Sequence, residues 1–125
     1  MADKKAESVR HVFQNYLVEG KPGFVAHEWA SIEQALNWIN GAGGVAVLAH
    51  PGRYPHDEAS ERELVAEFVG LGGQAIEVIT GAHSKKQIRH YAQMCLDLNL
   101  HASSGSDFHG VGESKMDVGR VPNLP

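Results

Sequence analysis

The chain begins with a hydrophobic pattern that is typical of an amphipathic helix. Apolar side chains recur at the i, i+3, i+4, i+7 and i+8 spacing that places them on one helical face. The pattern predicts a helix from about Asp3 to Glu19, ended by Gly20, with a turn and a short extended stretch at residues 24–26 after it. The apolar positions of this first helix are Val9, Val12, Phe13, Tyr16 and Leu17.

Three more helices are predicted from capping-box patterns. In each, a serine is followed three residues later by a glutamine or glutamate, and an apolar helical stripe comes after it. Glycine-rich stretches at 41–44 and 72–73 are expected to end the first two of these helices. The three pairs are Ser31 with Gln34, Ser60 with Glu63, and Ser84 with Gln87.

Strand-like segments lie between these helices. Val45–Ala49 is a continuous apolar run, which predicts a strand buried on both faces. Ala75–Ile79 and Leu100–Ser103 are the next two predicted strands. The resulting order of helix and strand, with short connections, predicts an α/β fold with parallel strands. From Val111 onward there is no periodicity, so residues 111–125 are expected to be an irregular tail.

Composition narrows the functional classes. The 125 residues carry 11 Lys and Arg against 15 Asp and Glu, a net charge of −4, which argues against a protein that binds duplex DNA nonspecifically. A single cysteine, Cys95, excludes a disulfide framework and a cysteine zinc finger. The polar start and the lack of any apolar run of ~20 residues predict a cytoplasmic protein without a membrane partner.

Polar side chains follow each predicted strand. His50 comes directly after the first strand, His83 follows the second, and Asp107 and His109 follow the third. Because the carboxyl ends of parallel strands meet at one edge of a sheet, these residues are expected to converge there. Imidazole and carboxylate groups suit a divalent metal ion such as zinc, manganese or iron. Taken singly, His50 also fits a loop histidine bonded to backbone, and Asp107 fits an Asx turn.

Two stretches, Val47–Tyr54 and Ser103–His109, resemble signature motifs of the PHP (polymerase and histidinol phosphatase) superfamily of metal-dependent phosphoesterases. The similarity is strongest to the bacterial subgroup that hydrolyses 3′,5′-nucleotide bisphosphates and trims short RNA from its 5′ end, and it runs from about Val9 to Pro125. It implies a (β/α)7-type barrel with up to three metal ions at its C-terminal rim. Further stretches that resemble the subgroup are Gly20–Val25, His27–Ala30, Gly43–Gly44, Gly72–Val78 and Val118–Arg120.

The resemblance implies catalytic roles for three residues of this chain. His50, Asp107 and His109 would be metal ligands, and a metal-activated hydroxide would attack phosphorus. Lys21 and Arg53 would hold substrate phosphate. The expected cofactors are divalent metal ions, with manganese favoured over zinc, iron or magnesium. The expected partner is a phosphorylated small molecule, a nucleotide or a short RNA.

Position along the chain suggests roles for two further residues. His83 precedes a predicted helix N-terminus, where a phosphate can bind, and is a candidate substrate-binding residue. Glu77 lies in the middle of a strand and is expected to support the site or to bond to a neighbouring strand. Trp29 and Trp38 flank the helix that begins after Ser31 and are expected in the core.

The chain departs from the family pattern because it contains no His-x-His pair. A complete barrel of this kind needs roughly 250 residues. Residues 1–125 are therefore expected to form one partial domain, the C-terminal half of the barrel, with an open sheet edge that favours self-association. The alternative to a phosphoesterase is a non-catalytic regulatory or assembly module that retains half of the fold.

Overall fold

A computed structural model describes residues 7–125 of the chain, which divides into two units, Met1–Ala30 and Ser31–Pro125. In the first unit, helix α1 (Val9–Val12) continues directly into a π-helical turn at Phe13–Leu17. The predicted helix is thus confirmed over its apolar positions but is shorter than expected. It begins after Ser8, whose hydroxyl accepts the N–H of His11 at 3.0 Å, and the predicted start at residue 3 lies outside the described residues.

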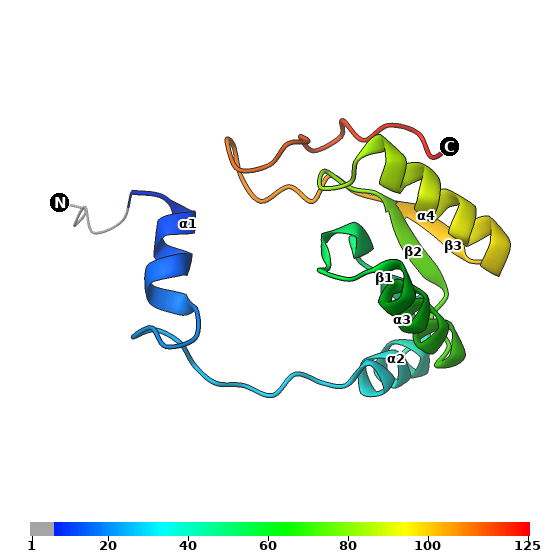
Figure 1. Ribbon diagram of the computed structural model, residues 1–125, viewed down its shortest axis with the longest axis horizontal. Helices are drawn as coiled ribbons and strands as arrows, with labels where there is room; N and C mark the ends of the chain where they lie inside the picture. Colours follow the sequence, from blue (N-terminus) through cyan, green and yellow to red (C-terminus); the bar gives the residue numbers. More distant parts are fainter. Residues whose placement is uncertain (1–6) are drawn as a thin grey trace. The chain divides into compact units, whose positions relative to one another are not determined.

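The second unit alternates helices and strands along the chain (Figure 1). Its three strands are parallel and pair in the order β1-β2-β3, so β2 is central. This confirms the predicted α/β class with parallel strands. The elements are α2 (Ile32–Gly41), β1 (Val47–Leu48), a 3-10 turn (Pro51–Arg53), α3 (Glu58–Gly70), β2 (Ala75–Ile79), α4 (Lys85–Leu98) and β3 (His101–Ser104).

Two of the three predicted helix starts are confirmed. The hydroxyls of Ser31 and Ser84 accept the backbone N–H groups of Gln34 and Gln87, and each glutamine side chain accepts the backbone N–H of its serine in return. These reciprocal bonds satisfy two backbone donors that helical hydrogen bonding leaves free at the first turn. Local sequence therefore determines where α2 and α4 begin.

The third predicted start, at Ser60, is wrong. Helix α3 begins earlier because Asp57 is its N-cap, with Oδ1 accepting the N–H and the hydroxyl hydrogen of Ser60. These bonds lower the pKa of the exposed Asp57 carboxyl below its usual value. A carboxylate at an N-cap also interacts favourably with the helix dipole, which explains why Asp57 is preferred to the serine three residues on.

The strand predicted at Val45–Ala49 is shorter and less buried than expected. Only Val47 and Leu48 form strand β1, and burial alternates along the segment. Ala46 and Leu48 are buried, whereas the side chains of Val45 and Val47 are 57% and 42% exposed. One face of this edge strand is therefore exposed to solvent, whereas the face that carries Ala46 and Leu48 is buried.

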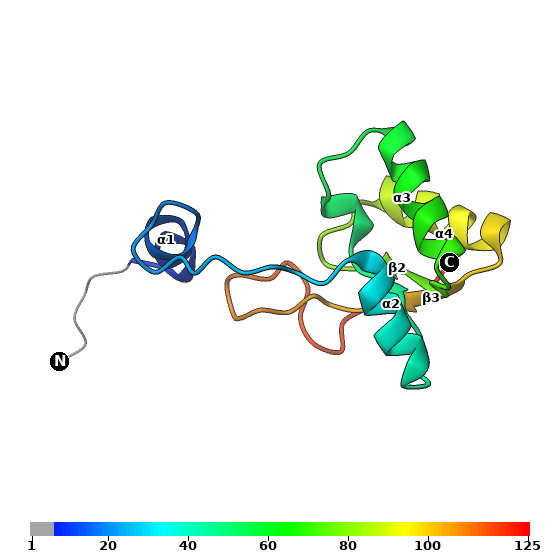
Figure 2. The ribbon, with the colours of Figure 1, turned by 90° about the horizontal axis from the view of Figure 1, so that it is seen from below.

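The hydrophobic core lies between the sheet and helices α3 and α4, which run side by side on one face (Figure 2). Ile76 and Val78 of the central strand are fully buried there, at 0% exposure. They pack with Val65 and Phe68 of α3 and with residues of α4. The remaining buried members of the core are Leu36, Ala46, Leu48, Ile79, Tyr91 and Cys95.

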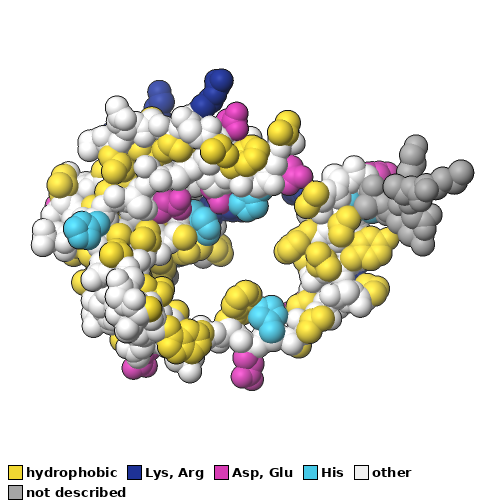
Figure 3. Space-filling view, turned by 180° about the vertical axis from the view of Figure 1, so that it is seen from behind, with side chains coloured by type: hydrophobic (Ala, Val, Ile, Leu, Met, Phe, Trp, Pro, Cys, Tyr) yellow, Lys and Arg dark blue, Asp and Glu magenta, His cyan; other side chains and the backbone are white. Residues whose placement is uncertain are grey.

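Large apolar side chains are exposed on both units (Figure 3). Trp29 is 85% exposed and Trp38 66%, so the expectation that both lie in the core is wrong. Trp38 belongs to helix α2, whose buried residue is Leu36, and no element of the Ser31–Pro125 unit covers the other face of this helix. Residues 105–125 form no helix or strand. None of the helices of the described chain combines the length and apolar character that crossing a bilayer requires.

Candidate functional site

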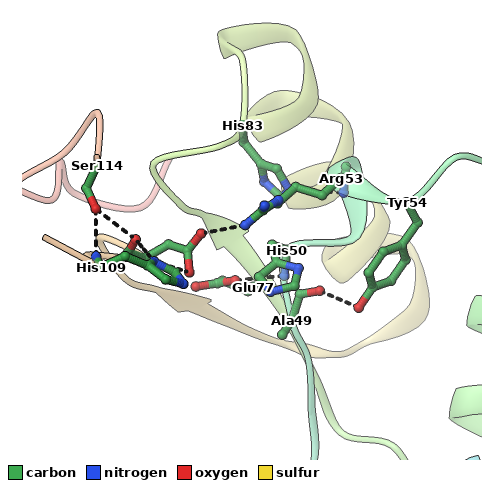
Figure 4. Close-up of polar contacts among 10 residues, drawn as sticks. Ala49, His50, Arg53, Tyr54, Glu77, His83, His109 and Ser114 are labelled. Atoms are coloured by element: carbon green, nitrogen blue, oxygen red, sulfur yellow. Dashed lines mark hydrogen bonds and ion pairs between the residues drawn. The ribbon is translucent and has the colours of Figure 1, made fainter. Parts of the chain in front are cut away.

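His50 lies two residues beyond the end of strand β1, at the edge of the sheet where the three strands end. Its backbone is left-handed, with φ of 32°, and its N–H donates to Oε2 of Glu77 at 2.7 Å (Figure 4). Nδ1 of His50 is buried and has no hydrogen-bond partner within the described residues. A buried ring nitrogen without a partner is costly in a folded protein, and a bound ligand would satisfy it.

Glu77 comes from the central strand and lies at this corner of the site. Its residue position pairs with Ser103 of β3, and its carboxylate crosses to the backbone of His50 beyond β1. Glu77 was expected either to support the site or to bond to a neighbouring strand; the structure shows its bond to the backbone of His50, and its support of a functional site stays a prediction. The contact explains how a carboxylate is accommodated in the middle of an otherwise apolar strand.

The loop after β3 holds Asp107 and His109 close together. Asp107 has a left-handed backbone, φ 53°, and its carbonyl oxygen lies 2.8 Å from Nδ1 of His109. The backbone N–H of His109 donates to Oγ of Ser114 at 2.6 Å, and that hydroxyl donates to the Asp107 carbonyl at 3.4 Å. Nδ1 of His109 therefore carries the hydrogen, which leaves Nε2 as a lone-pair donor, the arrangement that metal-binding histidines usually show.

Arg53 connects this loop to the loop after β1. Its Nη1 lies 3.0 Å from Oδ2 of Asp107, and its side chain is 52% exposed (Figure 4). An ion pair as exposed as this one contributes little stability, so its importance is that it brings a candidate phosphate-binding side chain to a candidate metal ligand. The neighbouring Tyr54 donates its hydroxyl to the carbonyl of Ala49 at 2.8 Å and thereby closes the loop.

The 3-10 turn that carries Arg53 is held by two side chains that follow strand β2. Nε2 of His83 accepts the N–H of Gly52 at 3.1 Å, and Nε2 of Gln87 donates to the Gly52 carbonyl at 2.9 Å. The other nitrogen of His83, Nδ1, lies 3.0 Å from the carbonyl of Val78. Both ring nitrogens of His83 are thus engaged within the chain. We define His83 and Gln87 as the Gly52 clamp.

This clamp changes the interpretation of His83. The sequence suggested His83 as a substrate-binding residue; in the structure both of its ring nitrogens make contacts within the chain, and a role in binding substrate stays a prediction. The ring also stacks on Tyr91 of α4, with centroids 5.0 Å apart. Gln87 contributes to the capping box of α4 as well, so the start of that helix and the Arg53 turn share one side chain.

A cavity of about 360 Å³ lies beside Asp107 and His109. Segments following both β2 and β3 contribute to its walls, and so does Arg53. Lys115 brings a second cationic side chain to it, and the sequence had offered no signal for this residue because it lies in the aperiodic tail. The lining residues are Arg53, Gly81, Ala82, Ser106, Asp107, His109, Glu113, Ser114 and Lys115.

These donors match a divalent metal ion in their chemistry but not in their grouping. The donor chemistry fits, because His50 has an unpartnered buried nitrogen and His109 has the tautomer of a metal ligand. The grouping is incomplete, because within residues 7–125 no three His, Cys, Asp or Glu side chains are close enough together to hold an ion. Asp107 and His109 are brought together, while His50 is linked to Glu77 instead. The predicted convergence of all three is therefore only partly reproduced.

Lys21, the other candidate phosphate-binding residue, belongs to the first unit. It lies in the turn after the π-helical segment, with its N–H bonded to the carbonyl of Val18 at 3.1 Å. Its role in binding phosphate stays a prediction.

A second polar cluster, which the sequence reasoning missed, connects helices α3 and α4. Glu61 is only 6% exposed, and its carboxylate accepts hydrogen bonds from Tyr91 at 2.7 Å and contacts Nε2 of His90 at 2.6 Å and of His56 at 3.2 Å. Burial alone would raise the pKa of Glu61, but these bonds outweigh it and lower the pKa. Burial and the Glu61 carboxylate together raise the pKa of Tyr91. The sequence did contain a signal for this cluster. Glu61 precedes Val65 and Phe68 at helical spacing, so it lies on the same buried stripe of α3.

Curated bacterial enzymes are similar to most of this chain. No protein-family model matches it. A 3′,5′-nucleoside bisphosphate phosphatase from Chromobacterium violaceum is 49% identical over 95% of this chain, and 5′-3′ exoribonuclease Rnm from Escherichia coli is 44% identical over 84%. The chain spans only 42% and 36% of the length of these two relatives.

Solved structures show the same fold. A Chromobacterium violaceum protein described as an amidohydrolase, with bound sulfate and no metal, matches 93% of this chain and 40% of its own, with a TM-score of 0.77 and 49% identity. A Bifidobacterium adolescentis protein described as a metal-dependent phosphoesterase matches 86% of this chain and 38% of its own, with a TM-score of 0.66 and 22% identity. The predicted resemblance to the PHP superfamily of phosphoesterases is thus confirmed along most of this chain, over a stretch that makes up about two fifths of those relatives.

Proposed function

We propose that this chain forms part of a metal-dependent phosphoesterase that hydrolyses phosphate esters of nucleotides or short RNA. The observation that carries the proposal is the ion pair between Arg53 and Asp107 beside His109, at the edge of a cavity. It places a guanidinium, which binds phosphate well, next to two side chains with metal-ligand chemistry. The names of the relatives, a nucleoside bisphosphate phosphatase and an exoribonuclease, support the substrate class.

In this proposal His50, Asp107 and His109 hold a divalent ion, manganese in the first instance. When bound, such an ion supplies Lewis-acid chemistry and makes a water molecule acidic enough to attack phosphorus at neutral pH. Arg53 binds and orients the phosphate and offsets the charge that develops on its oxygens. The Gly52 clamp holds the Arg53 turn, and Glu77 holds the backbone of His50, so both groups are oriented before substrate arrives.

The test measures Mn²⁺ binding by electron paramagnetic resonance and phosphate release from a nucleoside 3′,5′-bisphosphate. We expect His109→Ala and Asp107→Asn to weaken Mn²⁺ binding at least tenfold, since loss of one ligand removes a large part of the affinity, and to abolish Mn²⁺-dependent phosphate release. His101→Ala is the matched control, because His101 is an exposed histidine of β3 away from the cavity. It should change neither readout.

The incomplete ligand group favours one alternative, a non-catalytic regulatory or assembly module. The same experiment separates the two functions. A folded chain that binds no Mn²⁺ and releases no phosphate, with or without His109, would contradict the phosphoesterase and support the module. Phosphate release that does not depend on Mn²⁺ or on Asp107 would contradict the proposed ligands.

A further inference from the structure

A groove of about 720 Å³ lies between helices α3 and α4, which Figure 2 shows side by side, and the proposed chemistry does not use it. Among residues 7–125, it shares no lining residue with the cavity beside Asp107 and His109. The groove is therefore a separate surface of the Ser31–Pro125 unit, and its shape and charge indicate what could bind there.

The floor of the groove is apolar and follows both helices. Val65 and Val69 contribute to it from α3, and Met94 and Leu98 from α4. Each pair is four residues apart, so its two side chains follow one another along a helical face. The lining includes the first and the last residue of α3, which lie about 18 Å apart, or roughly three helical turns. Two neighbouring helices with side chains at this spacing form a surface into which a third helix can pack.

Negative charge gathers at the end of the groove where both helices terminate. Gly70 and Leu98, the last residues of α3 and α4, both line the groove, and neither helix has a basic side chain in its last turn. The partial negative charge that a helix carries at its C-terminus is thus not offset locally in either one. Asp97 adds a full negative charge, and the neutral amide of Gln93 donates to it at 2.8 Å. This end of the groove therefore attracts a cation.

The groove as a whole is also acidic. Its lining carries the carboxylates of Glu58, Glu61 and Asp97 against the guanidinium of Arg62 and the imidazole of His90. Glu58 and Arg62 lie 3.9 Å apart and are strongly exposed, so their pair is weak. An acidic groove in a chain of net charge −4 disfavours a second copy of the chain or an anionic surface, and it favours a basic ligand.

We propose that this groove is a docking site for a basic amphipathic helix of a partner protein. The apolar stripe of that helix packs on the apolar floor, and a Lys or Arg side chain reaches Asp97 and the C-terminal ends of α3 and α4. Burial of the floor supplies affinity, while the charges fix the direction of the bound helix. The docking site goes beyond the proposed function and does not depend on it, because the lining residues in the described part of the chain include none of the candidate metal ligands or phosphate-binding residues.

The test uses a fluorescein-labelled synthetic peptide of about 14 residues, with leucine at the i, i+3, i+4 and i+7 spacing and lysine and alanine elsewhere. Fluorescence anisotropy with the whole chain should show saturable binding of this lysine peptide. A peptide with glutamate in place of every lysine should bind at least tenfold more weakly. Leu98→Ser should weaken binding of the lysine peptide about fivefold because it removes apolar contact, and Asp97→Lys about tenfold because it reverses a charge.

Leu96→Ser and Glu63→Lys are the matched controls, since these exposed residues of α4 and α3 do not line the groove. Each should change the affinity by less than about twofold. Leu98→Ser and Asp97→Lys alter exposed side chains on separate grounds, apolar contact and charge, so one variant that circular dichroism shows to be folded is enough for the comparison.

Equal binding of the lysine and glutamate peptides, or equal losses in the variants and their controls, would overturn the docking site and indicate nonspecific adhesion. Absence of lysine-peptide binding at ~1 mM would overturn it as well. Sedimentation velocity tests a second copy as the occupant. Self-association that Leu98→Ser removes and Leu96→Ser leaves intact would assign the groove to a second copy and overturn the basic partner helix.

Discussion

Strands β1 and β2 are built from similar apolar runs but are buried to different extents. Ile76 and Val78 of β2 are fully buried, whereas Val47 of β1 is 42% exposed. The difference arises because β2 has a strand on each side and two helices over one face, while β1 is an edge strand with a single strand neighbour. Hydrophobicity therefore identifies a strand, and its neighbours decide how much of it is buried.

The candidate functional site also divides between the central strand and the edge strands. Glu77, from the central strand, holds the backbone of His50 beyond the edge strand, and the Gly52 clamp comes from the segment that follows β2. The candidate ligands and Arg53, by contrast, lie on the loops after β1 and β3. Residues of the well-packed central strand and of the segment after it thus position the candidate ligands and Arg53, which lie on loops that follow the edge strands.

The largest expected effect is in the central strand. Ile76→Ala should lower the free energy of unfolding by about 3 kcal/mol, because it removes buried methylenes and leaves a cavity that the surrounding side chains cannot fill. Urea denaturation followed by circular dichroism measures the loss. Ile76→Val, which should cost about 1 kcal/mol, keeps the comparison possible if the alanine variant fails to fold. Val47→Ala in the edge strand is the control, and a cost equal to that of Ile76→Ala would contradict the contrast between the strands.

A smaller effect is expected where α3 and α4 meet over the sheet. Glu61→Gln should cost about 2 kcal/mol at neutral pH, because a buried carboxylate loses charge-assisted bonds to Tyr91, His90 and His56. Since the folded state lowers the pKa of Glu61 below 4.5, the carboxylate adds stability above that pH and loses it as the pH falls through the folded pKa. The difference in unfolding free energy between wild type and Glu61→Gln should therefore shrink below about pH 4.5. If this difference grows on acidification instead, the pKa of Glu61 is raised and not lowered in the folded state.

A substitution at Gly52 tests whether the segment after the central strand positions the Arg53 turn. A Cβ at this position would lie 2.5 Å from Nε2 of Gln87 and 2.9 Å from the His83 ring, so Gly52→Ala should displace the clamp and cost about 1 kcal/mol. Gly70, in the last turn of α3, has open space around it, and Gly70→Ala should be neutral or stabilising by about 0.5 kcal/mol. Thermal unfolding of the two variants distinguishes them. Equal melting temperatures would mean that the clamp bonds contribute nothing.

The smallest effect on stability is expected at the open edge. Val47→Lys should change the free energy of unfolding by no more than about 0.5 kcal/mol, because the side chain already faces solvent. It should nevertheless reduce self-association, since a lysine on an edge strand disfavours pairing with another chain. Sedimentation velocity at high protein concentration measures this. A wild-type chain that is already a monodisperse monomer would contradict self-association through this edge.

Local sequence was sufficient for much of the fold. The capping boxes at Ser31 and Ser84 and the whole of strand β2 lie where they were predicted, because each depends on side chains within a few residues. The start of α3 was misplaced because Ser60 and Glu63 imitate a capping box, while Asp57 offers the stronger cap. The exposure of Trp29 and Trp38 could not be read from the pattern, since an apolar residue looks the same whether or not another element covers it.

The sequence by itself determined the alternation of helices and strands, the resemblance to the PHP superfamily and the loops that carry His50, Arg53, Asp107 and His109. These follow from periodicity, turn residues and short motifs, all of which are local. Only the tertiary structure decided that Arg53 pairs with Asp107, that His83 is engaged by Gly52 and Val78, and that Lys115 lies at the cavity. These contacts join residues from separate loops, and their geometry depends on how the strands are ordered and packed, which no local pattern encodes.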